Sequence, residues 1–298
     1  MKKILITGAN GNYGKSTIDF LLKKGLNANQ LVGLVRNAEK GAELKNLGIE
    51  VKIGDYENYN SMIEAFQGIE KVLLISGTDV ANRTKQHENV IKAAKESGVR
   101  HIIYTSIERK NESETSPLAF VSITHLATEK LLKESGLNYT ILRNTLYVDF
   151  IPMFLGEKVL ETGIYLPAAD GKAGFALRSE MAEATANILA SGGHESKEYH
   201  FSSAENVSFS EIASILKEIS GKEVSYFSPD VATFSKTLLD AGVPGEAVAI
   251  LGGFAAGIAA GELENSSNDL EILLGRKPTN VKDFLSSVYR QELEKRLI

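Results

Sequence analysis

The stretch KILITGANGNYGKS at residues 3–16 decides the fold class. A short apolar run is followed at once by Gly8, Gly11 and Gly14, and then by a segment with helical periodicity. Glycines at this spacing between a strand and a helix allow a tight turn, a close approach of backbone to a pyrophosphate, and close helix–strand packing. The stretch therefore predicts a dinucleotide-binding loop at the start of a helix, where N–H groups bind phosphate. Three further loop residues are placed against the dinucleotide: Asn10, Asn12 and Tyr13.

Outward from this loop, the first half of the chain alternates short apolar runs with helical patterns. The runs predict strands, because strands covered by helices on both faces are apolar throughout. Strands are expected at residues 3–7, 31–35, 50–53, 71–75, 101–105 and 139–143, and helices at 16–24, 39–47, 59–66, 84–97 and 123–135. Such βαβ repeats form an α/β fold with a doubly wound parallel Rossmann sheet, whose strands end at one common edge. The ligand site is expected at that edge.

The regular alternation weakens in the second half, which predicts a smaller α/β cap. Residues 1–150 are assigned to the Rossmann domain and residues 151–298 to the cap, with residues 173–202 returning to the Rossmann domain so that the two interleave. Strands are expected at 198–202 and 224–227, and helices at 209–220 and 231–241. The small-residue segment 252–261 is either a flexible loop or a closely packed helix.

The residue that ends the second predicted strand decides which dinucleotide fits. A carboxylate at this place accepts hydrogen bonds from the ribose hydroxyls of NAD, whereas an arginine pairs with the 2′-phosphate of NADP. Here the strand ends at Arg36, and Lys40 adds a second positive charge from the next turn. The pattern predicts NADP(H). A solvated surface role is the alternative for Arg36.

Polar residues follow the third, fourth and fifth predicted strands. Asp55, after the third, is placed either as the cap of the next helix or against the adenine. Ser76 and Gly77 close the fourth strand and Thr105 closes the fifth, which places them at the nicotinamide end of the site. Ordinary capping of strand ends is an equal alternative for these three.

An amide, a phenol and an aromatic ring follow the sixth predicted strand, in Asn144, Tyr147 and Phe150. At the carboxyl edge of the sheet these groups suit a pocket wall that holds a flat substrate. Aromatic residues at such positions equally often belong to the core.

The usual proton-transfer pair of short-chain reductases is missing. These enzymes commonly use Tyr-x-x-x-Lys, in which the lysine lowers the pKa of the tyrosine. No lysine lies four residues after any of the ten tyrosines. The helix expected to carry the pair has His125, a candidate catalytic or substrate-positioning residue whose alternative is a structural role. Asn144 and Tyr147 complete the catalytic candidates, and the chemistry is expected to need little acid–base help.

Composition excludes several other classes of site. The 298 residues contain no cysteine, which excludes disulfides and thiolate chemistry, and the five histidines show no metal-ligand spacing, so no metal is expected. A formal net charge of −5 disfavours nucleic acid as a partner. The N-terminal apolar run is too short for a signal peptide and no run is long enough to span a membrane, which predicts a cytoplasmic protein with no membrane partner. The oligomeric state is left open.

The motifs together resemble the NmrA-like branch of the atypical short-chain dehydrogenase/reductases, and within it bacterial NAD(P)H:quinone oxidoreductases and triphenylmethane reductases. The resemblance spans the full length and rests on the glycine loop and on VRN at 35–37, GDY at 54–56, LISG at 74–77, HLATE at 125–129 and LRNTLYVDF at 142–150. It implies an NADPH-dependent reductase whose nicotinamide lies among Ser76, Gly77, Thr105, Asn144 and Tyr147. The polar segment 107–120 departs from the family pattern and is expected to border the substrate.

Two functions from different classes remain open. The first is an NADPH-dependent reductase that transfers hydride to a small, flat, electron-poor acceptor such as a quinone, with His125 and Phe150 facing that substrate. A quinone suits the missing proton-transfer pair, since its reduced product is aromatic and solvent can protonate it. The second is a redox sensor of the NmrA type that binds NADP(H) without turnover. A nucleotide-sugar epimerase is disfavoured because it needs a proton-relaying tyrosine.

Overall fold

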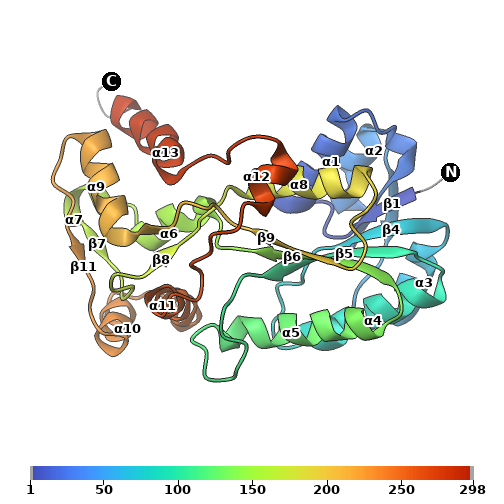
Figure 1. Cartoon of the computed structure of the whole chain (residues 1–298), viewed down its shortest axis with the longest axis horizontal. Helices are drawn as coiled ribbons and strands as arrows, with labels where there is room; N and C mark the ends of the chain where they lie inside the picture. Colours follow the sequence, from blue (N-terminus) through green and yellow to red (C-terminus); the bar gives the residue numbers. More distant parts are fainter. Residues whose placement is uncertain (1–2, 296–298) are drawn as a thin grey trace.

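The computed structural model describes the backbone of residues 3–295 and the side chains of residues 3–290. Seven parallel strands form the central sheet in the order β3-β2-β1-β4-β5-β6-β9. Helices cover both of its faces (Figure 1), which confirms the predicted doubly wound α/β sheet. The strand order reverses between β1 and β4, and in folds of this kind the ligand crevice opens at that point.

All six strands predicted in the first half are present, and so are the five helices. The elements are β1 (Lys3–Ile6), α1 (Asn12–Lys23), β2 (Leu31–Val35), α2 (Ala42–Asn46), β3 (Glu50–Ile53), α3 (Tyr59–Phe66), β4 (Ile69–Leu74), α4 (Arg83–Glu96), β5 (His101–Ile107), α5 (Ala119–Glu134) and β6 (Asn138–Asn144). Several boundaries differ from the prediction, among them the start of α5 at Ala119 instead of residue 123, and two of the differences have local reasons. Helix α1 begins at Asn12 instead of residue 16, because its first turn is fixed by packing against the glycine loop despite poor helix formers. The helix predicted at 39–47 is a 3-10 turn (Glu39–Gly41) followed by the short α2.

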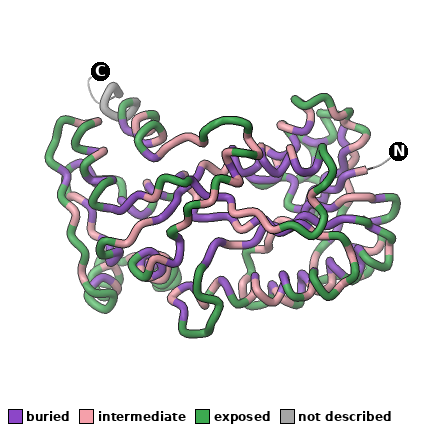
Figure 2. The backbone as a smooth tube through the Cα atoms, viewed as in Figure 1, coloured by how far each residue is buried: buried purple, intermediate pink, exposed green. Residues whose placement is uncertain are grey.

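Two apolar layers hold these helices to the sheet. Helices α1 and α8 (Arg178–Ala190) cover one face, and α3, α4 and α5 cover the other (Figure 1). The sheet between them is buried along most of its length, while the outer sides of the helices are exposed (Figure 2). Burial on both faces explains why the strands are apolar throughout and could be located from sequence.

The second half of the chain supplies both the cap and part of the Rossmann layers. Strand β9 (Lys197–Phe201) is the predicted strand 198–202; it pairs with β6 as the edge of the central sheet, and α8 packs on α1. The remaining elements are α6 (Ile151–Leu155), α7 (Val159–Thr162), β7 (Ile164–Tyr165), β8 (Lys172–Ala173), β10 (Val207–Ser208), α9 (Phe209–Ser220), β11 (Tyr226–Phe227), α10 (Val231–Asp240), α11 (Gly245–Ala259), α12 (Asp269–Leu274) and α13 (Val281–Lys295). Most of them surround a separate apolar core at the left of Figure 1.

The small-residue segment at 252–261 lies largely within a helix, α11. A Cβ atom at Gly253 would lie 2.6 Å from Cε1 of Phe120, and one at Gly257 would lie 2.5 Å from Cδ2 of Leu118. Glycine at these positions lets α11 lie this close to the start of α5 without any movement of Phe120 or Leu118. The small residues therefore lie in the contact between the cap and α5.

Candidate functional site

A cavity of about 520 Å³ lies at the carboxyl edge of the sheet, in the size range of small-molecule sites. Its wall comes from the segments that follow the first four strands and from the start of α4. Seven of the residues predicted from sequence line it: Gly8, Asn10, Gly11, Arg36, Asp55, Ser76 and Gly77. Nine further lining residues were not assigned to the site from sequence: Leu34, Val35, Gly54, Tyr56, Glu57, Ile75, Thr78, Asp79 and Gln86.

The glycine loop packs tightly on the first turn of α1. Gly8 has φ +55°, a conformation that favours glycine, and the N–H of Gly11 donates to the carbonyl of Gly8 at 2.9 Å. A Cβ atom at Gly14 would lie 2.4 Å from the same carbonyl oxygen. No side chain caps the start of α1, and no carboxylate lies in its first turn. The N–H groups at this end of α1 are therefore left for an anion.

Tyr13 points away from the cavity. Its hydroxyl lies 2.7 Å from Oγ1 of Thr185 and donates to the carbonyl of Met181 at 3.2 Å, so it ties α1 to α8. Burial raises the pKa of Tyr13 far above its usual range, which keeps the phenol protonated. The neighbouring Asn12 is exposed at the first position of α1 but does not line the cavity.

Arg36 follows β2 and reaches the cavity with an exposed side chain. Within the described part of the chain it pairs with no carboxylate, so its guanidinium is available to a ligand. Lys40 lies farther along the same exposed segment and does not line the cavity. Its backbone N–H donates to Oδ1 of Asn37 at 3.1 Å, which shapes the turn after Arg36.

Asp55 lines the cavity and is not the cap of the next helix. The cap of α3 is Asn58, whose Oδ1 accepts from the N–H of Ser61 at 3.0 Å. The Asp55 carboxylate accepts from the N–H of Glu57 at 3.0 Å, which holds it in a tight turn at the mouth of the cavity. Of the two roles left open by the sequence, helix capping is therefore excluded.

The turn at Ser76 and Gly77 is held in place by residues from two elements. The N–H of Ser76 donates to Oγ1 of the buried Thr105 at 2.9 Å, so Thr105 supports the cavity wall from behind. The N–H of Gly77 donates to Nε2 of His87 at 3.2 Å, and Nε of Arg83 donates to the carbonyl of Gly77 at 2.7 Å. Helix α4 thereby fixes both backbone groups of Gly77.

His87 must be neutral to make this contact. Its Nε2 accepts a hydrogen bond, so its proton resides on Nδ1, which lies 2.9 Å from Oγ1 of Thr128. Burial and the nearby Arg83 lower the pKa of His87 to about 3. This role was not predicted from the sequence, because a histidine inside a polar helix has no distinctive spacing.

The aromatic group after β6 lies beside a cation. The rings of Tyr147 and Phe150 are 5.5 Å apart, and the Arg178 guanidinium lies 5.6 Å and 5.9 Å from their centres. Asp149 accepts from the N–H of Arg178 at 2.9 Å and thereby joins this segment to the start of α8. Burial raises the pKa of the Tyr147 phenol, which is therefore protonated at neutral pH.

Asn144 is the buried end of β6. Its Nδ2 lies 3.5 Å from the Tyr147 hydroxyl, and its Oδ1 is a buried acceptor with no partner among the described residues. Buried polar atoms are rarely left unpaired in proteins. The side-chain Oδ1 of Asn144 is therefore an unsatisfied acceptor that is closed to solvent in this structure, and Asn144 does not line the cavity.

His125 lies under the sheet and does not line the cavity. The imidazole Nδ1 lies 2.7 Å from the hydroxyl of Tyr104, a fully buried residue of β5. Burial, with the nearby Arg83 and His87, lowers the pKa of His125 well below its usual value.

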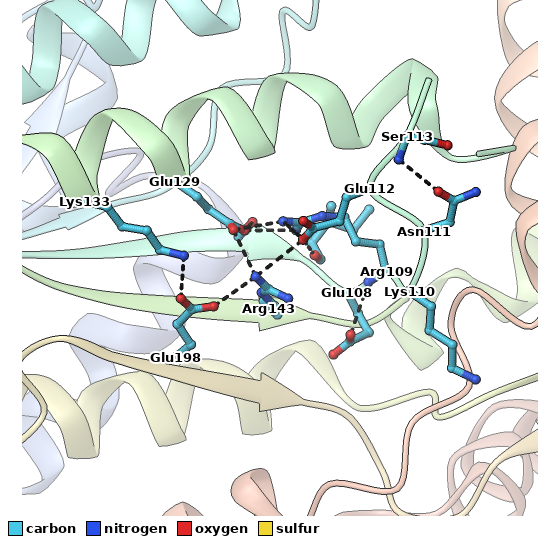
Figure 3. A network of polar contacts seen from close by, with 12 residues as sticks. Glu108, Arg109, Lys110, Asn111, Glu112, Ser113, Glu129, Lys133, Arg143 and Glu198 are labelled. Atoms are coloured by element: carbon cyan, nitrogen blue, oxygen red, sulfur yellow. Dashed lines mark hydrogen bonds and ion pairs between the residues drawn. The ribbon is translucent and has the colours of Figure 1, made fainter. Parts of the chain in front are cut away.

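A buried ionic network lies between α5 and the outer strands (Figure 3). The carboxylate of Glu129 accepts three hydrogen bonds. Two come from Nη1 and Nη2 of Arg109, at 2.9 Å and 2.8 Å, and one comes from Nη2 of Arg143 at 3.1 Å. Arg143 also pairs with Glu198 of β9 at 2.9 Å. The network holds the start of segment 107–120 against the sheet.

Two further buried carboxylates attach the same segment to the second half of the chain. Oε2 of Glu108 lies 2.7 Å from Nδ1 of His200 on β9. Glu262, just after α11, accepts from the N–H of Asn111 at 2.8 Å and from the hydroxyl of Ser116 at 3.0 Å. The segment expected to border the substrate is therefore firmly anchored at several points.

Neither a membrane-spanning helix nor a metal-binding cluster is present among the described residues. No helix within residues 3–295 is long and apolar enough to cross a membrane. Over the same part of the chain, no group of three histidine or carboxylate side chains is arranged to hold a metal ion.

Comparison with known proteins agrees with the fold and the motifs. The model of the NmrA-like family matches residues 1–285. Quinone oxidoreductase 2 of Escherichia coli strain K12 is 37% identical over 287 residues, which cover 96% of this chain and 98% of that protein. The crystal structure of the E. coli NADPH-dependent quinone oxidoreductase with NADPH superposes with a TM-score of 0.89 at 36% identity, over 96% of this chain and 99% of that one. The Citrobacter sp. triphenylmethane reductase with NADP(H) gives 0.88 at 36% identity and the same coverage. The chain belongs to the NmrA-like family, as its motifs predicted.

Proposed function

We propose that this protein is an NADPH-dependent reductase that passes hydride to a small, flat, electron-poor acceptor, most simply a quinone. The observation that carries the proposal is a cavity in which the glycine loop and an unpaired Arg36 meet at the carboxyl edge of the sheet. The similar proteins support both parts, since one is named a quinone oxidoreductase and two were solved with NADPH or NADP(H).

The residues present fit the phosphates of NADPH. The start of α1 has no capping side chain, and the contact of Gly14 with the Gly8 carbonyl leaves no room for a Cβ atom. This arrangement brings backbone N–H groups to the pyrophosphate. Arg36 is assigned to the 2′-phosphate, which a guanidinium binds through two parallel hydrogen bonds.

The other residues orient the reacting ring. NADPH supplies the hydride from its nicotinamide, and the protein has to hold that ring and the acceptor in register. The fixed turn at Ser76 and Gly77 supports one side of the nicotinamide ring. Tyr147 and Phe150 provide aromatic surface for a flat acceptor.

The acceptor class follows from what the site lacks. With no Tyr-x-x-x-Lys pair, the chain offers no tyrosine activated by a lysine to protonate an alkoxide. A quinone does not require one, because hydride addition gives an aromatic hydroquinone anion that takes its proton from water. Aldehydes and ketones are expected to be poor substrates for the same reason.

Loss of NADPH absorbance tests the proposal directly. Purified protein is assayed with a panel of quinones, cationic dyes and aldehydes, and NADPH binding is measured separately by titration calorimetry. Oxidation of NADPH with quinones and none above background with aldehydes is expected. If NADPH binds but no acceptor is reduced, the protein is a sensor of NADP(H) and the enzymatic proposal is wrong.

A further inference from the structure

We propose that Gln86 selects the adenine of NADPH, with its Oε1 accepting a hydrogen bond from the exocyclic amine of that ring. The inference rests on the proposed function, because it names how the same cavity recognises its cofactor. Gln86 belongs to α4 and was given no role from the sequence.

Gln86 is part of the cavity wall. It lies in the first turn of α4 and lines the cavity together with Arg36 and Gly77. A Cβ atom at Gly77 would lie 3.2 Å from Oε1 of Gln86, so this oxygen lies beside a glycine that has no side chain to cover it. The amide oxygen of Gln86 is therefore at the surface that a bound ligand contacts.

Two carboxylates fix the orientation of the Gln86 amide. Its Nε2 donates to Oε1 of Glu57 at 3.2 Å and to Oδ2 of Asp79 at 3.3 Å. Hydrogen bonds from Asn82 and from Gln86 hold the pKa of Asp79 below its usual range, so this carboxylate is ionised at neutral pH. Because an ionised carboxylate cannot donate, the reversed amide would place its oxygen against acceptors. Nε2 must therefore face the carboxylates, which leaves Oε1 on the other side of the amide.

Oε1 of Gln86 has no donor within the described part of the chain. No side chain or backbone N–H there forms a hydrogen bond with it. It is also absent from the unpaired polar atoms that are closed to solvent, a group that includes Oδ1 of Asn144. The cavity thus presents an oriented and accessible acceptor, which fits a ligand group that carries an N–H or O–H.

The charge of the surrounding wall determines which ligand group fits. Asp55, Glu57 and Asp79 all line the cavity, and the N–H of Glu57 donates to the Asp55 carboxylate, which places these two in one turn. Carboxylates repel the phosphates of a dinucleotide, which are assigned to the glycine loop and Arg36. The acidic end of the cavity suits a neutral group with N–H donors instead.

NADPH carries two neutral groups of this kind, the amine of adenine and the carboxamide of nicotinamide. Arg36 lines the same cavity and is assigned to the 2′-phosphate, which lies on the adenosine half of the cofactor. Thr105, Asn144 and Tyr147, which are expected around the nicotinamide, do not line it. The cavity therefore fits the adenosine half, and the amine that meets Gln86 is that of adenine.

Replacement of the amine by an oxygen tests this contact without any turnover. In reduced nicotinamide hypoxanthine dinucleotide phosphate, a carbonyl oxygen replaces the adenine amine and would face the Gln86 oxygen, so that two acceptors oppose each other. We expect the parent protein to bind NADPH about 10-fold more tightly than this analogue, measured as the ratio of the two Kd values by titration calorimetry.

Gln86→Met is the variant that removes the contact. Methionine keeps the unbranched shape of glutamine but has no amide, so the ratio of the two Kd values should fall below about 3-fold. Since Glu57 and Asp79 are both exposed, they remain solvated in the variant, and Gln86→Leu repeats the test with a second side chain. Gln67→Met is the matched control with an unchanged ratio, because Gln67 is exposed at the end of α3 and does not line the cavity.

The fragment 2′,5′-ADP shows which half of the cofactor Gln86 contacts. It carries the adenine and the 2′-phosphate but no nicotinamide. Gln86→Met should weaken 2′,5′-ADP and NADPH by the same factor of about 10. A variant that binds NADPH more weakly but 2′,5′-ADP like the parent protein would assign Gln86 to the nicotinamide half and overturn the proposal.

The outcomes separate this inference from the proposed function. If the parent protein binds NADPH but does not distinguish it from the hypoxanthine analogue, or if a folded Gln86→Met distinguishes them as the parent does, the role of Gln86 is refuted and the reductase proposal stands. If the parent protein binds neither NADPH nor 2′,5′-ADP, the proposed function fails as well. Thermal unfolding of each variant shows that it is folded.

Discussion

Gly14→Ala is the sharpest test of how the glycine loop works. The added Cβ atom would lie 2.4 Å from the carbonyl oxygen of Gly8, 2.9 Å from Cα of Ala9 and 3.0 Å from the Gly8 carbonyl carbon. All three atoms belong to the backbone, so no side chain can turn aside to relieve the contact. Since non-bonded heavy atoms prefer separations near 3.5 Å, the loop and α1 must separate by roughly 1 Å.

Two opposing effects determine how Gly14→Ala changes the free energy of unfolding. Alanine is more favourable than glycine inside a helix by about 1 kcal/mol, whereas overpacking of a tight contact costs about 1–3 kcal/mol. Gly14→Ala should therefore leave the stability unchanged or lower it by up to about 2 kcal/mol, where an ordinary helical site would gain. Displacement of the loop by this distance should weaken NADPH binding by about 10- to 100-fold.

Gly245→Ala is the matched control for this variant. Gly245 also lies in the first turn of a helix, α11, but a Cβ there meets only Cδ2 of Leu239, at 3.8 Å. The Gly245→Ala variant should therefore have a slightly higher melting temperature than the parent protein and unchanged NADPH binding. Calorimetric titration with NADPH and thermal unfolding of both variants provide the comparison. If Gly14→Ala binds NADPH like the parent protein and is as stable as Gly245→Ala, close packing of the loop does not explain the cofactor site.

Three other predictions address specificity, stability and catalysis. Arg36→Asp should lower the preference for NADPH over NADH by at least about 10-fold, measured as the ratio of the two Kd values, because the guanidinium that pairs with the 2′-phosphate is lost. An unchanged ratio would show that another group binds the 2′-phosphate. Glu129→Gln should lower the free energy of unfolding in urea by about 3 kcal/mol at neutral pH, because it removes the buried carboxylate partner of Arg109 and leaves only the half-exposed Glu112. Burial alone would raise the pKa of Glu129, yet hydrogen bonds and charge from Arg109 hold it below its usual range, so this stabilisation is present at neutral pH and is lost as the pH falls through the folded-state pKa. The difference between Glu129→Gln and the parent should accordingly shrink in acid. Tyr147→Phe should bind NADPH normally and keep measurable kcat with quinones, since its phenol is protonated but not required as an acid; complete loss of turnover would contradict that.

The sequence predicted the features that depend on neighbours along the chain. Strands buried on both faces have an apolar pattern that is visible locally, and the glycine loop is defined by three residues within one turn. The position of Arg36 follows directly from the end of β2. These are the features that place the cavity at the carboxyl edge.

Contacts between distant segments could not be predicted in this way. The Tyr13 hydroxyl contacts Thr185 of α8, which lies 172 residues later in the sequence. The support of Gly77 by His87 depends on how α4 turns relative to β4, which no periodicity fixes. The sequence assigned Tyr13 to the cofactor loop, whereas the structure places it in the first turn of α1 with its side chain against α8.

Helix α5, which was expected to carry the tyrosine–lysine pair, has a different arrangement of side chains in this protein. Glu129 lies four residues after His125, the spacing that Tyr-x-x-x-Lys uses to place a lysine beside its proton donor. A carboxylate facing the imidazole would raise the pKa of His125, but this one is neutralised by two arginines and holds segment 107–120 to the sheet. The imidazole is left among positive charges and far from protonation. The same helix positions therefore serve anchoring and hydrogen bonding instead of proton transfer, and turnover should be confined to acceptors whose reduced form needs no acid from the protein.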